Sequence, residues 1–165
     1  MMDLSYGGDL AYNHNETFVD MFLANADKLG GKTAVADIDG KIAYGELALY
    51  TKVVANRLIE LGVKPNDFVL VKMPRCKEYM IAVIGVLRAG ACWVPVDPEY
   101  PADRIAYMIE DCGAKVTIDV DWLLALKKHY GVRALTLPKV NLAKPDNLAY
   151  MLYTSGSTGK PKGEM

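Results

Sequence analysis

Cysteine and histidine are scarce in this chain, and their spacing excludes several kinds of site. Among 165 residues there are three cysteines and two histidines. The cysteine count is odd and no Cys-x-x-Cys pair occurs, so neither a disulfide framework nor a zinc site is indicated. Cys76, Cys92 and Cys112 each lie in an apolar stretch, which is typical of buried free thiols in a reducing compartment. His14 and His129 stand alone, so the sequence predicts no metal cluster and no Ser/His pair.

Long hydrophobic runs and an excess of one charge are also missing. The longest apolar run, residues 80–87, is far too short to span a bilayer. The N-terminus, MMDLSYGGDL, is acidic and weakly apolar, unlike a signal peptide. The formal net charge is −1, so there is no overall basic field to attract nucleic acid or an anionic membrane. We therefore expect a cytoplasmic protein with neither a nucleic-acid nor a membrane partner, in which any phosphate recognition is local.

Alternating strand and helix patterns predict an α/β fold of about one domain. The apolar periodicity indicates a first helix within residues 15–31, and the Asp39-Gly40 pair between two short β-prone runs indicates a hairpin. The further expected helices cover 46–61, 76–90, 101–113 and 121–131, and the last of these begins at an Asp cap, Asp121. The expected strands cover 68–73, 91–96, 115–120 and 148–153, with a possible additional strand at 132–137.

This alternation predicts a doubly wound, mostly parallel sheet with helices on both faces, because βαβ units cross over with a right hand and cover both sides. In such sheets ligands bind beyond the carboxyl ends of the strands. The stretch YTSGSTGKPKG, residues 153–163, begins where the last expected strand ends. Its position therefore indicates a ligand-binding segment.

The stretch offers the groups that a phosphate chain needs. Two glycines permit backbone conformations that turn N–H groups toward an anion. Hydroxyls can donate hydrogen bonds, and lysines supply positive charge. The residues are Gly156 and Gly159, then Thr154, Ser155, Ser157 and Thr158, and then Lys160 and Lys162. A flexible Gly/Ser tail has the same composition, but the preceding strand and the spaced lysines favour phosphate binding.

Two common nucleotide motifs do not fit this stretch. A Walker A loop needs a glycine where Thr154 stands and a hydroxyl residue where Pro161 stands. A dinucleotide fingerprint needs G-x-G-x-x-G at the first strand–helix turn, and the stretch has neither that spacing nor that position. The residues alone therefore predict a phosphate loop on an α/β sheet and go no further.

The stretch LAYMLYTSGSTGKPKG, residues 148–163, resembles the phosphate-loop core motif of the adenylate-forming superfamily. That superfamily contains acyl-CoA synthetases, luciferases and the adenylation domains of nonribosomal peptide synthetases. Two more stretches, 42–50 and 86–116, resemble its first and second core motifs in the expected order. The residues of the second and third motifs are most similar to those in the N-terminal part of an amino-acid adenylation domain. D-alanine–carrier protein ligases and acyl-CoA synthetases stay open as alternatives.

A few positions depart from the family pattern. Ala43 stands where the family often has threonine, and Arg88 stands where lysine is common. Glu164 replaces an aliphatic residue, which predicts a shortened or altered strand at this point.

The resemblance implies ATP-dependent activation of a carboxylic acid. The acid attacks the α-phosphate of ATP, bound with Mg²⁺, and pyrophosphate leaves. The acyl-adenylate then passes to a thiol, usually the phosphopantetheine arm of a carrier protein. In this scheme Lys162 helps to hold the loop, and the β- and γ-phosphates are wrapped by Thr154, Ser155, Gly156, Ser157, Thr158 and Gly159.

The same resemblance assigns structural rather than chemical roles to the other polar residues of the core motifs, which are Tyr44, Glu46, Asp97 and Glu99. We expect the carboxylate pairs Glu110/Asp111 and Asp119/Asp121 to be solvated or to cap helices rather than to bind Mg²⁺.

Family members are much longer than this chain. The match therefore predicts that residues 1–165 form the N-terminal subdomain of an adenylation domain, without a catalytic or metal-binding residue of their own. The amino-acid pocket, the Mg²⁺ ligands and the catalytic lysine are expected downstream, and the isolated chain is expected to be inactive. The alternative is a stand-alone nucleotide-binding or partner-binding module that has kept the fold without the chemistry.

Overall fold

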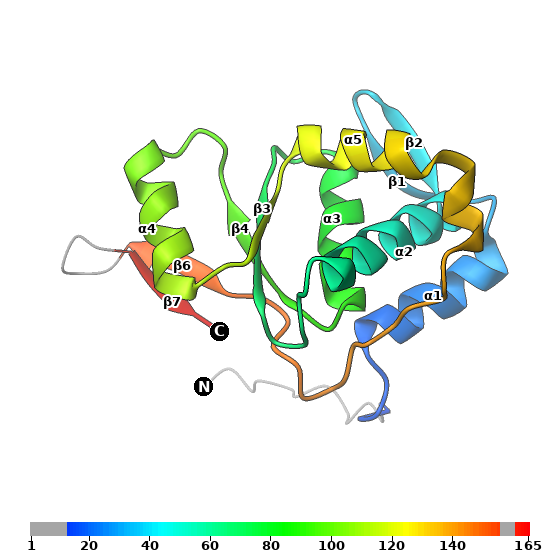
Figure 1. The fold of residues 1–165 in the computed structure, drawn as a ribbon. Helices are drawn as coiled ribbons and strands as arrows, with labels where there is room; N and C mark the ends of the chain where they lie inside the picture. The colour runs from blue at the N-terminus through cyan, green and yellow to red at the C-terminus, as the bar shows by residue number, and fades with distance from the viewer. Residues whose placement is uncertain (1–12, 156–160) are drawn as a thin grey trace, which may run out of the picture.

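The computed structural model describes residues 13–155 and 161–165. Figure 1 shows a central sheet flanked by helices, with a hairpin and α1 at one end and a two-stranded ribbon at the other. The helices are α1 (Phe18–Leu29), α2 (Tyr44–Glu60), α3 (Lys77–Arg88), α4 (Ala102–Cys112), α5 (Val120–Tyr130) and the 3-10 helix η1 (Gly131–Thr136). The strands are β1 (Thr33–Asp37), β2 (Gly40–Ala43), β3 (Phe68–Lys72), β4 (Cys92–Val96), β5 (Val116–Ile118), β6 (Leu152–Ser155) and β7 (Pro161–Glu164). Within these residues no helix has the length and apolar character that crossing a membrane requires.

The central sheet is parallel, with strand order β4-β3-β5. Alternate residues of β3 face two different cores. Val69 and Val71 belong to the larger core, which also contains residues of α2, α3 and α5. Leu70 belongs to the smaller core, together with β4 residues and Met108 of α4. Because both faces of the sheet are covered by helices, the predicted doubly wound α/β architecture is confirmed.

The predicted N-terminal helix and hairpin are both present. Thr17 and Asp20 form a capping box at the start of α1, in which each side chain accepts a hydrogen bond from the other residue's backbone N–H. Strands β1 and β2 pair antiparallel, and Asp37 lies opposite Gly40 at the turn. Gly40 has a φ of 138°, a conformation that favours glycine.

Two local predictions around α5 are wrong. The chain forms η1 rather than a strand at 132–137. Val132 and Leu135 are 83% and 66% exposed, so these apolar residues do not face the core that the strand prediction required. The cap of α5 is Asp119 rather than Asp121: Asp119 has the extended backbone of a cap and accepts a hydrogen bond from Trp122 N at 2.8 Å.

The last expected strand, 148–153, is only partly regular. Trp93 of β4 exchanges hydrogen bonds with Ala149 and Met151, which makes one isolated parallel bridge. The next N–H toward this edge would come from residue 95, which is a proline and has no N–H to donate. Pairing with β4 therefore stops, and the chain continues as β6, which pairs antiparallel with β7. The strand expected to be shortened near residue 164 forms through Glu164.

A buried arginine holds the connector between η1 and β6. Arg88 is only 3% exposed. Its Nε and Nη2 donate to the carbonyl of Val140 at 3.0 and 2.9 Å, and its Nη1 donates to Ala48 O at 2.8 Å and Thr51 Oγ1 at 2.9 Å. Burial lowers the pKa of Arg88 to about 10. One guanidinium thus joins α2, α3 and the connector.

Helices α2 and α3 pack so closely that residue 85 has to be glycine. A Cβ built on Gly85 would lie 2.5 Å from the Cβ of Val54. We predict that Gly85→Ala lowers the free energy of unfolding by about 1–2 kcal/mol, because the steric overlap outweighs the better helix propensity of alanine. Chemical unfolding followed by circular dichroism measures the change.

Gly31→Ala is the matched control, because a Cβ at Gly31 meets no heavy atom within 4 Å. Its stability should stay within about 0.5 kcal/mol of the parent chain. Equal unfolding midpoints for the two variants would contradict the close packing of α2 on α3.

Candidate functional site

A cavity of about 920 Å³ lies at the carboxyl edge of the parallel sheet. Its walls are the loops that follow β3 and β4, residues 73–77 and 95–100, together with residues 35–37 of β1 and residues 152 and 153 of β6. This volume is in the range of small-molecule sites, and the carboxyl edge is where parallel α/β sheets bind their ligands.

The β6–β7 ribbon stands beside this cavity and carries the ends of the predicted phosphate loop. Thr154 lies directly opposite Lys162, and Ser155 lies opposite Pro161. Thr154 Oγ1 is 3.5 Å from Glu164 Oε1, and the side chains of Thr154 and Lys162 are exposed. The remaining predicted phosphate ligands, Gly156, Ser157, Thr158 and Gly159, lie outside the described residues. The phosphate-binding role of the loop therefore stays a prediction.

Tyr153 fixes the ribbon against α4. Its hydroxyl donates to Asp111 Oδ2 at 2.7 Å and lies 3.3 Å from Met108 O. Burial and the neighbouring carboxylate raise the pKa of Tyr153 well above its usual value, so the hydroxyl stays protonated as a donor. Asp111 thus anchors the strand that leads into the loop, a role that sequence reasoning missed because the partners are far apart in the chain.

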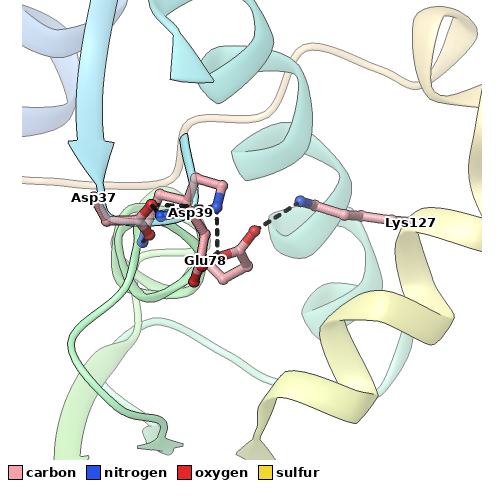
Figure 2. A network of polar contacts seen from close by, with 5 residues as sticks. Asp37, Asp39, Glu78 and Lys127 are labelled. Atoms are coloured by element: carbon pink, nitrogen blue, oxygen red, sulfur yellow. Dashed lines mark hydrogen bonds and ion pairs between the residues drawn. The ribbon is translucent and has the colours of Figure 1, made fainter. Parts of the chain in front are cut away.

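The start of α3 forms another wall of the cavity and is capped from a distance. Cys76 makes no side-chain cap, and Asp37 of β1 instead accepts a hydrogen bond from Lys77 N at 2.8 Å. Figure 2 shows this network, in which Glu78 also reaches Lys127 of α5 at 3.7 Å. A carboxylate at a helix N-terminus is favourable because it meets unpaired N–H groups and the positive end of the helix dipole. The cap was missed in the sequence because Asp37 is remote from α3.

Several carboxylates of the core motifs have local structural contacts. Asp97 Oδ1 accepts a hydrogen bond from Glu99 N at 2.9 Å, which closes the turn after β4. Glu46 lies in the first turn of α2, where negative charge is favourable. In residues 13–155 and 161–165, no group of three or more His, Cys, Asp or Glu side chains could hold a metal ion.

The cysteines of the described chain are free thiols. Cys92 is buried, whereas Cys76 and Cys112 are half-buried. Burial raises the pKa of Cys92 to about 11, so this thiol is neutral and unreactive at physiological pH.

These features define an α/β protein in which the β6–β7 ribbon, whose strands flank residues 156–160, stands beside a ligand-sized cavity at the carboxyl edge of a parallel sheet. Residues 22–165 match the family described as AMP-binding enzyme, and the chain belongs to this family. It is similar to parts of nonribosomal peptide synthetases, and this similarity confirms the resemblance carried by the core motifs.

Curated relatives cover nearly the whole chain. Gramicidin S synthase 2 of Brevibacillus brevis is 38% identical over 93% of this chain and 4% of that protein. Bacitracin synthase 2 of Bacillus licheniformis is 39% identical over 92% of this chain and 6% of that protein. Delta-poly-L-ornithine synthetase of Acinetobacter baumannii is 40% identical over 90% of this chain and 12% of that protein. The chain spans only a small part of the length of these relatives.

Solved structures agree with the fold. The nonribosomal peptide synthetase FmoA3 is 28% identical with a TM-score of 0.75, over 90% of this chain and 17% of that chain. The N-terminal subdomain of NpsA from Klebsiella oxytoca is 26% identical with a TM-score of 0.72, over 88% of this chain and 39% of that chain. VinN has a TM-score of 0.80 over 94% of this chain and 44% of that chain. At 22% identity it supports the fold alone.

The Asp37 cap makes a pH-dependent prediction. The N–H of Lys77 that donates to Asp37 holds the pKa of this carboxyl below its usual value. A carboxyl with a lowered folded-state pKa stabilises the fold above its unfolded pKa of about 3.9, and this stabilisation is lost as the pH falls through the folded-state pKa. We expect Asp37→Ala to lower the unfolding midpoint at pH 7 and to lower it much less at acid pH.

Asp39→Ala is the control for this experiment, because the hydrogen bond between Asp39 and Asp37 uses the backbone N–H of Asp39 and not its carboxylate. Unfolding midpoints measured for both variants across the acid range test whether the ionised Asp37 carboxylate stabilises the fold. A loss for Asp37→Ala that is the same at every pH would rule out the ionised cap.

Proposed function

We propose that this chain is the phosphate-loop-bearing N-terminal subdomain of an ATP-dependent ligase. The ligase activates an amino acid as its aminoacyl-adenylate and passes the acyl group to the phosphopantetheine thiol of a carrier protein. Three findings support the proposal: membership of the AMP-binding enzyme family, relatives that are peptide synthetases, and a cavity at the sheet edge beside the loop. FmoA3 has a structure in an AMPPNP-bound form, and the NpsA subdomain has one with 3-hydroxybenzoyl-AMSN.

The pairing of Thr154 with Lys162 across the ribbon is the observation that carries the proposal. It sets a hydroxyl donor and a cation side by side where the loop leaves the sheet. Donors and charge fixed in advance around a triphosphate stabilise the negative charge that grows on pyrophosphate as it leaves, and they orient the α-phosphate for attack by the carboxylate. The residues of this chain therefore bind and position, while the attacking and accepting groups come from the substrates.

A second cation stands at the same cavity. Arg75, in the loop after β3, lines the cavity and makes no ion pair within the described part of the chain. Lys77, by contrast, is held by Asp37 and Glu78. Arg75 is thus available to a phosphate or carboxylate group. Mg²⁺ would arrive with the nucleotide.

The first test is binding of polyphosphates to the 165-residue chain. If the loop recognises only the phosphate tail, ATP and inorganic tripolyphosphate should bind with similar affinity, and AMP should not bind detectably. Lys162→Met should weaken ATP binding about three- to fivefold, the effect of one exposed ion pair. Isothermal calorimetry at fixed ionic strength measures both.

Lys144→Met is the control variant, because Lys144 lies in the connector and lines a different cavity. If AMP binds as tightly as ATP, or if the two lysine variants lose the same amount of ATP affinity, phosphate binding at the ribbon is contradicted. Tight, saturable ATP binding without any exchange activity would instead support the stand-alone nucleotide-binding module.

The second test is amino-acid-dependent exchange of pyrophosphate into ATP. We expect no exchange by the isolated chain, because the phosphate loop binds and positions the nucleotide but supplies no reacting group. Exchange above background would overturn the assignment of the chain as a subdomain without catalysis. Exchange by the intact parent protein, assayed with amino acids and with fatty acids, separates an amino-acid ligase from an acyl-CoA synthetase.

A further inference from the structure

A second cavity, of about 370 Å³, lies between α1, α2 and the connector that follows η1. In Figure 1 the connector descends past α2 and α1, at the opposite end of the molecule from the β6–β7 ribbon. This second cavity is therefore separate from the one at the carboxyl edge of the sheet, and its lining residues do not include any member of the predicted phosphate loop.

Positive charge dominates this cavity. Its lining includes three cationic side chains, Arg88, Lys52 and Lys139, and only one carboxylate, Asp27. In the described residues Arg88, Lys52 and Lys139 form no ion pair. Burial lowers the pKa of Lys52, and the positive charges of Arg88 and Lys139 lower it further. A bound anion would offset the repulsion between these like charges.

The cations have hydrogen-bond donors to spare. A guanidinium has five N–H groups, and the bonds of Arg88 to Val140, Ala48 and Thr51 use four of them. One Nη2 N–H is left without an acceptor in the described structure, on a side chain that is only 3% exposed. Lys52 Nζ has three N–H groups and donates two, to Leu135 O at 3.3 Å and Leu137 O at 3.2 Å. An unused donor on the buried Arg88 is costly unless an acceptor completes it, whereas Lys52 is only partly buried.

Most of the rest of the cavity wall is apolar. Leu23 of α1, Ala48 and Leu49 of α2, and Leu135 and Val140 near the connector form this part, and Gly45 and the polar Asn141 complete the lining. A ligand that fits both parts of the wall has a single anionic group and an apolar body. We propose that this cavity binds a small carboxylic acid, whose carboxylate accepts hydrogen bonds from Arg88, Lys52 and Lys139 and whose apolar part lies against the leucines.

Titration of the isotope-labelled chain with sodium benzoate tests this site. Backbone amide signals of residues 48–49 and 139–141 should shift with saturation, and benzyl alcohol, which has the same ring but no charge, should leave them nearly unchanged. Inorganic phosphate, which has charge without an apolar body, should bind more weakly than benzoate. Equal binding of benzyl alcohol or of phosphate, or no saturable shift with benzoate, overturns the proposal.

Variants separate this site from general charge effects. Lys139→Met should weaken benzoate binding about fivefold and Lys52→Met about tenfold, since Lys52 is the more buried cation. Lys128→Met, on the exposed surface of α5, should leave the affinity unchanged. If Lys52→Met disturbs the fold by releasing η1, Lys139→Met still tests the binding site, because Lys139 makes no hydrogen bond within the described residues. Equal losses for Lys139→Met and Lys128→Met would contradict the site.

Discussion

The fold depends on a charge that has to be satisfied inside the protein. The guanidinium of Arg88 is almost completely buried, and it has no carboxylate partner in the described residues, so backbone carbonyls and a hydroxyl must surround it. Those acceptors come from α2 and from the connector, which is thereby drawn across the helices before the chain returns to the sheet. The backbone of Arg88 continues the same link, because its carbonyl accepts a hydrogen bond from Leu142 N at 2.8 Å. Burying one cation thus determines the route by which the chain reaches the predicted phosphate loop.

Pro95 then determines how the loop leaves the sheet. One bridge at Trp93 aligns the returning chain with β4, and the missing N–H of Pro95 prevents a second. The chain is free to pair with β7 instead, which brings Thr154 opposite Lys162. The aromatic rings of Tyr79 and Tyr150 lie against Trp93, with centroids 6.0 and 5.9 Å away, and hold the single bridge in place.

Periodicity and turn chemistry predicted most of the fold because α3, α4 and β3 have strong local patterns. Predictions were wrong where tertiary contacts decide. Residues 132–137 are β-prone, but they form η1 with Val132 and Leu135 exposed. Asp121 already lies in the first turn of the helix that Asp119 caps. The candidate site was partly predictable: the motif identified the loop, whereas the cap by Asp37 and the anchor from Tyr153 to Asp111 join residues distant in sequence. The cavity beside α1 had no sequence signal, because its cations come from three separate segments.

The composition of β7 has a consequence for how the protein meets other molecules. Among the described residues β7 pairs only with β6, so its outer edge offers unpaired backbone groups. Open edges of this kind recruit strands from neighbouring molecules unless proline and charged side chains interrupt them. Within its four residues β7 has Pro161, Lys162 and Glu164. The residues that resemble a phosphate-loop motif therefore also protect the chain against edge-to-edge self-association, so substitutions made there to probe nucleotide binding will also change colloidal behaviour.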